Sequence, residues 1–543
     1  MTVRESIAAA LEAAAREIGA EGDLPDLELA RARNPAHGDF ASSAGMKLAR
    51  QLRRAPNLIA GELVAAVRLP EGEATAEAAG GYVNFRLSPS WLQRLVGEVA
   101  AAGADYGRSD LGRGERVQVE FGSTNPTGPL HVGHGRGYIL GDSLASLLAF
   151  TGHEVEREFY VNDQNTQAVK FGLSILARQR GEEPPEGGYL GDYVGELAEE
   201  ARRQGVPPNE AHLRRFGVQQ IVEGFERELA RIGIHYDSWY RESETWSSGL
   251  GQEAIERLTR GGYLVERDGA LWFAPALADE SAPEEDRVVR RRTGEYTYFA
   301  SDLGYLLNRF ERRGFQRVIE VWGSDHHGYV PRMKSAAAAL GIDPDRLVII
   351  LNQLVTLTEG KMSKRAGRMV TLSELIDRVG ADAVRWFYLS RTADTQMEFD
   401  LELATARNRT NPVFYVQYAH ARLCGIERTA ADRELPETAE LDLLREPWEL
   451  DLARQLAQWP DAVADAARLM EPHRTTFFLY EVADRVSTFY EAGNDNGDFR
   501  VVVDDPRLTR ARLELCRAAR ATLRSGLDLL GVAAPDRMER MED

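Results

Sequence analysis

Four short apolar runs in the middle of the chain are separated by longer polar or helical segments. They are VQVEFGS at 117–123, HEVEREFYVND at 153–163, RVIEVWGSD at 317–325 and LVIILNQLVTL at 347–357. Each run has the length and bounding residues of a buried strand. YILGDSLASLLAF at 138–150 has the pattern of a helix between the first two. A strand, a crossover helix and a second strand predict a parallel α/β sheet of the Rossmann type.

The pattern changes on both sides of this region, which predicts three domains. Residues 1–110 predict a small α+β domain, with helical segments, a strand at 80–88 and a glycine-rich linker at 103–116. Residues 115–400 predict the α/β domain, interrupted by a mostly helical insertion at about 165–290 that contains a hairpin-like stretch at 263–275. Residues 401–543 are helical almost throughout and predict an all-α bundle.

Composition excludes several classes of protein. No apolar run approaches 18 residues, so we expect no membrane span and no membrane partner. The alanine-rich N-terminus lacks a basic segment and an export cleavage pattern, which favours a first helix over a signal peptide. Cys424 and Cys516 lack metal-ligand spacing and predict reduced core cysteines in a cytoplasmic protein. A net charge of −19 argues against general DNA binding, but leaves room for a local basic surface that fits one structured RNA.

Lysine is scarce, and its distribution marks one segment. The chain has five lysines among 66 basic residues, and two of them lie in Lys361-Met362-Ser363-Lys364. Arginine replaces lysine wherever only positive charge is needed, so a remaining lysine indicates a role for a compact charge on a flexible stem. A second unusual element, His131-Val132-Gly133-His134, lies upstream and contains two of the ten histidines.

These two elements follow the ends of predicted strands, where open α/β sheets bind ligands. A helix that begins after Gly135 would direct its N-terminal amides at a phosphate. Two imidazoles three residues apart can donate hydrogen bonds to phosphate oxygens, and Lys361 and Lys364 can neutralise an α-phosphate and a leaving pyrophosphate. This arrangement suits in-line displacement at the α-phosphorus of a bound nucleotide, for which positioning and electrostatics supply most of the rate. After the lysines, Thr371 and Glu374 predict the capping box of a further helix.

His-Val-Gly-His and Lys-Met-Ser-Lys resemble the two signature sequences of the class I aminoacyl-tRNA synthetases. The surrounding sequence is most similar to the arginyl-tRNA synthetase family: VEFGSTNPTGPLHVGHGRGYILGDSLASLL, REFYVNDQNTQ, TYFASDLGY, VWGSDHHGYVPRMK and FYVQYAHAR. The resemblance is dense from about 115 to 430, and the ends match in organisation. One departure is Arg365, where many class I enzymes have serine. Both lysines are kept, so activity is not in doubt.

The resemblance implies an enzyme that activates arginine with ATP and Mg²⁺ and transfers it to the 3′ end of tRNA(Arg). It implies a domain at 1–110 that contacts the tRNA elbow, and a C-terminal anticodon-binding domain. The implied catalytic residues are His131, His134, Lys361 and Lys364. The implied ATP-binding residues are these four together with Gly133, Gly323, Asp325, Met362 and Ser363. The implied tRNA contacts are Phe40, Tyr418 and Arg422, for which core or ordinary helix positions are the alternative.

Arginine selectivity has a physical basis, because a buried guanidinium needs carboxylate partners. Asp302 lies four residues after Tyr298, on the same face of a helical turn. The resemblance implies that Tyr298 and Asp302 hold the guanidinium, whereas Glu120 and Asn125 hold the backbone ammonium and carboxylate of arginine. The alternative for Asp302 is a helix cap or a surface acid.

Other interpretations of the sequence remain open. A smaller-substrate adenylyltransferase shares the H-x-G-H nucleotide site, but leaves the helical C-terminal region unexplained. An inactive RNA-binding paralogue is disfavoured by the intact histidines and lysines. Asp325-His326-His327 suggests a metal site, but the sequence shows no further ligand cluster, so we expect no protein-bound metal. We also expect a monomer without an organic cofactor.

Overall fold

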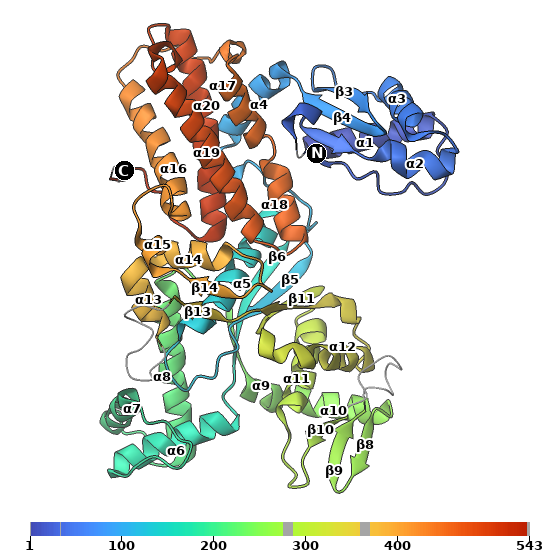
Figure 1. The fold of residues 1–543 in the computed structure, drawn as a ribbon. Coiled ribbons are helices and arrows are strands. Elements are labelled where there is room, and N and C mark those ends of the chain that lie inside the picture. Colours follow the sequence, from blue (N-terminus) through green and yellow to red (C-terminus); the bar gives the residue numbers. More distant parts are fainter. Residues whose placement is uncertain (1, 33, 275–285, 359–369, 540–543) are drawn as a thin grey trace.

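The computed structural model describes residues 2–32, 34–274, 286–358 and 370–539. Figure 1 shows a central parallel-sheet domain, a tall bundle of helices above it and a small N-terminal domain beside the bundle. The predicted fold class is confirmed: a parallel-sheet domain carries an N-terminal α+β domain and a C-terminal helical domain.

The N-terminal domain is built on a four-stranded antiparallel sheet of order β1-β2-β4-β3. Its first helix begins with a capping box formed by Thr2 and Glu5. The helix buries Ile7 and Leu11, four residues apart, in the core of the domain. The elements of this part are α1 (Val3–Glu17), β1 (Ala30–Arg31), β2 (Phe40–Ser42), α2 (Ala44–Leu52), α3 (Pro56–Ala66), β3 (Ala74–Ala79), β4 (Tyr82–Leu87) and α4 (Pro89–Ala102).

The central domain is organised around a five-stranded parallel sheet of order β12-β11-β5-β6-β7. The strands predicted at 117–123, 153–163 and 317–325 are β5, β6 and β11, and the predicted helix at 138–150 is the later part of α5. The central position of β5 places the loop that follows it at the middle of the carboxyl edge of the sheet. Before the inserted segment the elements are β5 (Arg116–Phe121), α5 (Val132–Phe150) and β6 (Glu154–Val161). After it they are β11 (Arg317–Gly323), α12 (Val330–Ala339) and β12 (Leu347–Asn352).

The segment expected as an insertion contributes one strand to the sheet. Residues 238–241 form β7, which pairs with β6 at the edge. The sequence SWYR is only four residues long and has no clear strand pattern. It is a strand because it pairs with β6. The predicted hairpin is present as β8 and β9, extended by β10 into a small antiparallel sheet. The elements are α6 (Thr166–Arg180), α7 (Asp192–Arg203), α8 (Glu210–Ala230), β7 (Ser238–Arg241), α9 (Glu242–Ser247), α10 (Leu250–Arg260), β8 (Leu264–Arg267), β9 (Ala270–Phe273), β10 (Arg287–Arg290), α11 (Tyr298–Leu307) and the π-helix η4 (Asn308–Arg312).

The run predicted as one strand at 347–357 is two strands. After β12 the chain leaves the main sheet, and β13 pairs in parallel with β14. Arg136 of α5 fixes this departure, because its buried guanidinium donates to the carbonyls of Gln353, Thr392 and Thr395. The elements are β13 (Val355–Leu357), α13 (Leu372–Val379), α14 (Ala381–Leu389), β14 (Met397–Phe399) and α15 (Leu401–Thr405). Thr371 and Glu374 form the predicted capping box of α13.

The C-terminal domain is a bundle of long helices whose core is continuous with that of the sheet domain. Arg385 of α14 joins the two, since its buried guanidinium donates to the Leu530 carbonyl and to Asp142 of α5. Within the bundle, Arg512 pairs with Glu449 at 2.7 Å, both fully buried. The helices are α16 (Pro412–Ala430), α17 (Pro447–Leu456), α18 (Trp459–Arg468), α19 (His473–Asp495) and α20 (Pro506–Leu530), and α4 packs against α20. No helix among the described residues is both long and apolar enough to cross a bilayer.

Candidate active site

The His-Val-Gly-His element forms the N-terminus of α5, which begins four residues earlier than the sequence predicts. His131 is the N-cap and His134 is the third residue of the helix. The Gly133 amide donates to Nδ1 of His131 at 3.2 Å, and the His131 amide points to Nδ1 of His134 at 3.5 Å. The imidazoles take the place of a serine–glutamate capping box, so the helix begins at Val132 rather than after Gly135.

Both imidazoles are neutral in this arrangement. The rings lie 3.5 Å apart between centroids and are half-buried. Burial lowers the pKa of His131, and burial together with the neighbouring imidazole of His131, whose protonation would disfavour a second positive charge, lowers the pKa of His134 to about 3. Because each Nδ1 accepts from the backbone, the ring proton of each neutral imidazole lies on Nε2. The site therefore offers two Nε2–H donors at a helix N-terminus, a combination that suits an anion.

Two glycines allow the close packing around this helix start. Gly122, after β5, has φ +101°, and a Cβ there would lie 2.3 Å from Tyr138 of α5. At Gly135 a Cβ would lie 2.9 Å from both Leu372 and Tyr388. The loop after β5 and helices α13 and α14 thus converge on the first turn of α5.

The second signature element, Lys361-Met362-Ser363-Lys364, lies outside the described residues. Its flanking residues are described. Thr358 donates to the Phe399 carbonyl of β14, and the Val132 amide donates to the Val370 carbonyl at 3.1 Å. The Leu372 amide donates in turn to the Leu130 carbonyl at 2.9 Å. The chain that follows the lysine element is therefore joined directly to the start of α5.

Gly323 and Asp325 lie at the carboxyl end of β11, next to β5 in the sheet. A Cβ at Gly323 would lie 2.5 Å from Asp325 Oδ1, so the glycine makes room for that carboxylate. The side chains of Asp325 and His326 are exposed, and Oδ2 of Asp325 lies 3.5 Å from Nε2 of His326. Among the described residues, a group close enough to share a metal ion is instead His420, Cys424 and Asp536. There Nδ1 of His420 donates to the Pro535 carbonyl at 3.0 Å, which removes that nitrogen as a ligand.

Glu120 and Asn125 lie at the end of β5 and in the loop after it. Glu120 is buried, accepts from Ser123, and lies 3.7 Å from the Arg309 guanidinium. Burial and the nearby Glu320 raise the pKa of Glu120 to about 8, against the opposing effect of Arg309. Asn125 is exposed and accepts from the Asn165 side chain at 2.6 Å. A buried acid whose neutralisation is incomplete is suited to a cationic ligand.

Tyr298 and Asp302 lie one turn apart on α11, as the sequence predicts. The cap of this helix is Thr297, so Asp302 is not a cap. Tyr298 is 45% exposed, whereas Asp302 is partly buried and accepts from the Tyr329 hydroxyl at 2.5 Å. Burial raises the pKa of Asp302 to about 7.

A third acid beside this helix was not found from the sequence. Glu242 begins α9, immediately after the edge strand β7, and is 4% exposed. Its negative charge contributes to the raised pKa of Asp302, and burial raises its own pKa. Its Oε2 has no hydrogen-bond partner among the described residues. The sequence does not indicate this acid because it does not predict β7. Only the pairing of β7 with β6 brings Glu242 to the carboxyl edge of the sheet.

The three residues expected to contact tRNA lie in different surroundings. Phe40 is 2% exposed and packs in the N-terminal core. Tyr418 and Arg422 share one partly exposed face of α16, where Arg422 lies over the rings of Tyr418 and Tyr490 at 4.7 and 4.2 Å. Phe414 stacks on Tyr418 from the previous turn. This face presents aromatic and guanidinium groups of the kind on which unpaired bases stack. The ring of Phe40 is buried and presents no such surface.

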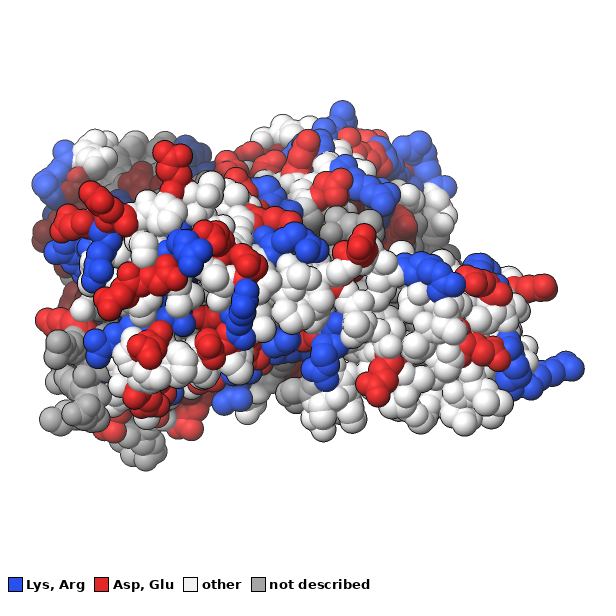
Figure 2. Space-filling model, turned by 90° about the horizontal axis from the view of Figure 1, so that it is seen from above, with Lys and Arg blue, Asp and Glu red and all other residues white. Residues whose placement is uncertain are grey.

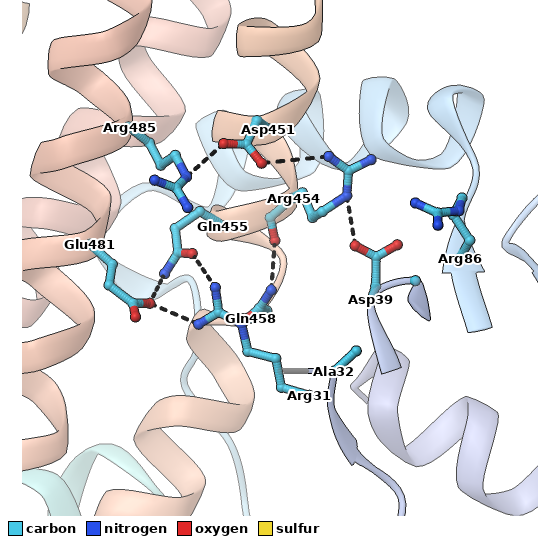
Figure 3. A pocket seen from close by; sticks show the side chains of 11 residues that line it. Arg31, Ala32, Asp39, Arg86, Asp451, Arg454, Gln455, Gln458, Glu481 and Arg485 are labelled. Carbon is cyan, nitrogen blue, oxygen red and sulfur yellow. Dashed lines mark hydrogen bonds and ion pairs between the residues drawn. The ribbon is translucent and has the colours of Figure 1, made fainter. Parts of the chain in front are cut away.

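A charged cavity of about 510 Å³ lies between the N-terminal domain and the bundle, away from the parallel sheet (Figure 3). Arg454 pairs with Asp39 at 2.6 Å, Arg31 pairs with Glu481 at 2.7 Å, and each pair joins the two domains. Figure 2 shows the same mixture on the upper face, where acidic and basic side chains are interspersed. The cavity therefore lies in a polar interface between the two domains, in which Arg31 and Arg454 already have acidic partners.

The fold and the arrangement at the first turn of α5 define the class. The family model described as the tRNA synthetases class I (R) catalytic domain matches residues 98–186 and 196–393. The chain belongs to the class I aminoacyl-tRNA synthetases. Models for the arginyl-tRNA synthetase N-terminal domain and the DALR anticodon-binding domain match residues 1–87 and 416–538.

Individual relatives identify the family within this class. The arginine–tRNA ligase of Moorella thermoacetica is 44% identical over 98% of this chain and 99% of its own. That of Desulfitobacterium hafniense is 43% identical over 99% of both. The arginyl-tRNA synthetase structure from Thermus thermophilus aligns with a TM-score of 0.82 at 25% identity, over 98% of this chain and all of that one. The chain belongs to the arginyl-tRNA synthetase family, whose members join arginine to tRNA(Arg) with ATP as a substrate.

Proposed function

We propose that this chain carries out the family reaction at the carboxyl edge of its parallel sheet. It activates arginine with ATP and transfers the product to tRNA(Arg). The observation that carries this proposal is the adjacency of two sites: neutral imidazole donors at the N-terminus of α5, and buried acids on β5 and α11. The first suits a polyphosphate and the second a cation, and their common position at the carboxyl edge of the sheet suits the joining of arginine to an α-phosphate.

The proposed roles follow from what each group can donate or accept. Nε2–H of His131 and of His134 donate to phosphate oxygens, and Lys361 and Lys364 supply charge to the α-phosphate and pyrophosphate. Gly133, Gly323, Asp325, Met362 and Ser363 complete the ATP site. The arginine carboxylate attacks the α-phosphorus, pyrophosphate leaves, and a hydroxyl of the tRNA 3′ end then displaces AMP from the arginyl-adenylate.

We propose that Mg²⁺ arrives with ATP. It usually retains several waters and binds through substrate phosphates rather than an all-protein cage. The imidazole and amide donors around α5 suit phosphate oxygens and not the ion itself, which fits this role. When bound, Mg²⁺ neutralises charge on the phosphates.

For the amino acid, we propose that Asp302 and Tyr298 hold the guanidinium, with Glu242 as a second carboxylate. Glu120 and Asn125 hold the α-ammonium and α-carboxylate. The support is burial, because a desolvated guanidinium that keeps its proton is bound well only beside acids. For both Asp302 and Glu120, burial and neighbouring acids raise the pKa more than Arg309 lowers it.

We further propose a monomer in the cytoplasm with the domains 1–110, 115–400 and 401–543. The proposed catalytic and arginine-binding residues all come from one chain. Cys424 and Cys516 are buried and free, as expected in a reducing compartment. Light scattering of the purified chain with and without tRNA tests the monomer, and a mass of two chains without tRNA would contradict it.

Arginine-dependent exchange of pyrophosphate into ATP tests the function, measured with and without tRNA(Arg). We expect exchange that requires arginine, together with charging of tRNA. Exchange that does not respond to arginine would indicate an adenylyltransferase for another substrate. A chain that binds tRNA but shows neither reaction would be an inactive paralogue, although the similarity extends over both the catalytic and anticodon-binding domains.

Arginine affinity is expected to rise with pH. Asp302 and Glu120 have pKa values of about 7 and about 8 in the empty site. Each must be ionised to hold a cation, so affinity increases as pH passes through these values. Between pH 6 and pH 8.5 the expected gain is about tenfold or more, since one pKa unit corresponds to about 1.4 kcal/mol. Titration calorimetry in several buffers measures it, and proton release on binding is expected. Constant affinity across this range would contradict ionisation of either acid on binding.

The face of α16 is expected to contribute to tRNA binding. Tyr418→Ala and Arg422→Ala should each raise the KM for tRNA(Arg) about tenfold, the lower end of what loss of one stacked base costs. The KM for arginine should not change, because α16 lies in the bundle. Tyr418→Phe is the matched control: it keeps the ring and should keep the affinity. Unchanged tRNA affinity in both alanine variants would remove this face from the contact.

A further inference from the structure

Three buried glutamates form a row across the catalytic sheet. Glu320 of β11 is directly opposite Glu120 of β5, and Glu120 is opposite Glu158 of β6. They are 2%, 3% and 0% exposed, respectively. Because the three strands are parallel and in register, their side chains point to the same face of the sheet. Three desolvated carboxylates in one row require cations nearby.

Two arginines from one helical turn form ion pairs with glutamates of this row. Arg309 lies in the π-helix η4, and Arg313 directly follows it. Arg313 pairs with Glu158 at 2.6 Å, and Glu158 also accepts from Gln118 and from Tyr305. Arg309 pairs closely with Glu320. The wider π turn is rare and is common at functional sites. Residues four apart lie on one face of a helical turn, and Arg309 and Arg313 both face the same row.

The charges of the row do not balance. Two guanidiniums face three carboxylates, and Glu158 and Glu320 each hold one of them closely. Glu120 has a hydroxyl donor from Ser123 and a distant contact of 3.7 Å to Nη1 of Arg309. Arg309 stacks on the Tyr305 ring at 4.0 Å, and its Nε and Nη2 have no hydrogen-bond partner among the described residues. Glu120 thus lies beside a cation that another carboxylate holds in place.

We infer that Arg309 is a positioning residue of the arginine site. Glu320 anchors its guanidinium beside Glu120, where it favours the ionised form of Glu120 without occupying it, so that the α-ammonium of arginine completes the charge balance of the row. Arg309 acts only through Glu120 and does not touch the substrate. The inference depends on the role proposed above for Glu120.

The charges around Glu120 determine the sign of the effect. The groups that face it are Glu320 from β11, Glu158 and Tyr160 from β6, Tyr236 before β7, Tyr305 from α11, Arg309 from η4 and Ser123 from the loop after β5. Burial and Glu320 raise the pKa of Glu120, whereas Arg309 lowers it. Loss of Arg309 therefore raises that pKa further, and loss of the Glu320 charge lowers it. Loss of Arg309 should therefore move the pH dependence of arginine binding to higher pH, and loss of the Glu320 charge should move it to lower pH.

The test measures arginine dissociation constants from pH 6 to pH 8.5 in the full-length protein. Arg309→Met should weaken binding about tenfold at pH 7, equivalent to one pKa unit, and the loss should shrink as pH rises. Glu320→Gln is nearly isosteric and should strengthen binding at pH 6 to 7, with the pH dependence shifted to lower pH. Arg309→Lys keeps the charge and should recover much of the affinity. ATP affinity should not change in any of the three.

Controls separate positioning from folding. Arg512→Met removes an arginine that is equally buried beside Glu449 in the bundle, and should lower stability without altering the pH dependence. A uniform loss at every pH in Arg309→Met, or a shift of Glu320→Gln to higher pH, would overturn the inference. Should Arg309→Met fail to fold, the shift in Glu320→Gln and the recovery in Arg309→Lys still decide it.

Two further measurements separate failure of this inference from failure of the site. Glu120→Gln should weaken arginine binding and abolish the pH dependence that Arg309 controls. 5-Guanidinopentanoate, which is arginine without its α-amino group, should bind Arg309→Met and the parent equally. If Glu120→Gln binds arginine normally, the proposed role of Glu120 is wrong. If it binds poorly but Arg309→Met keeps the parental pH dependence, only the role of Arg309 is wrong.

Discussion

Asp302→Asn is expected to weaken arginine binding by about 3–5 kcal/mol, the cost when a buried ion pair loses one partner. Asparagine keeps the shape of the side chain and its contact with the Tyr329 hydroxyl, but removes the charge. The guanidinium cannot respond by losing its proton, so the full penalty of desolvating an unpaired cation falls on binding. Titration calorimetry at pH 8, where Asp302 is ionised in the parent, measures the difference.

The comparison ligand for this variant is citrulline, which has the shape of arginine without its charge. The parent should reject citrulline strongly, and Asp302→Asn should discriminate less. Asp325→Asn is the matched control, since this exposed acid is assigned to the ATP site and should alter ATP affinity alone. Arginine affinity within about threefold of the parent, less than 1 kcal/mol, would exclude Asp302 as the specificity residue. Glu242 would then be the next acid to replace, because one of its oxygens is buried and unpartnered in the described chain.

His134→Ala is expected to slow adenylate formation by roughly two to four orders of magnitude, the scale of losing contacts that strengthen in the transition state. The imidazole is neutral, and its Nε2–H is fixed because Nδ1 faces the His131 amide. Loss of this donor should affect charge developing on the phosphates and leave arginine affinity unchanged. Lys364→Ala should have a similar effect. Single-turnover formation of arginyl-adenylate separates this step from tRNA transfer.

The control for His134 lies at the other end of the same helix. His153 follows α5, and its Nδ1 donates to the Leu148 carbonyl at 2.9 Å, so His153→Ala perturbs the helix without reaching the phosphates. It should retain near-normal activation. Near-normal pyrophosphate exchange in both His134→Ala and Lys364→Ala would exclude the proposed phosphate contacts.

The sequence alone determined the fold class and the position of the nucleotide element. Apolar runs such as 117–123 and 317–325 identified β5 and β11, because strands buried on both faces need continuous apolar residues. Thr371 and Glu374 identified the start of α13, since a capping box depends only on neighbours three residues apart. Tyr298 and Asp302 were placed on one helical face for the same local reason. Family resemblance then supplied the roles proposed for these residues.

The tertiary structure alone decided which distant groups meet. Nothing local in SWYR marks β7 as a strand, yet its pairing with β6 brings Glu242 to the active edge. Strand register places Glu320, Glu120 and Glu158 in one row, although more than 160 residues separate the first from the last. Register and burial are set by packing between segments far apart in the chain, and they control the pKa values of these acids through desolvation and mutual repulsion. For this reason the sequence identified the acids of the arginine site one at a time, whereas their shared charge balance appears only in the folded sheet.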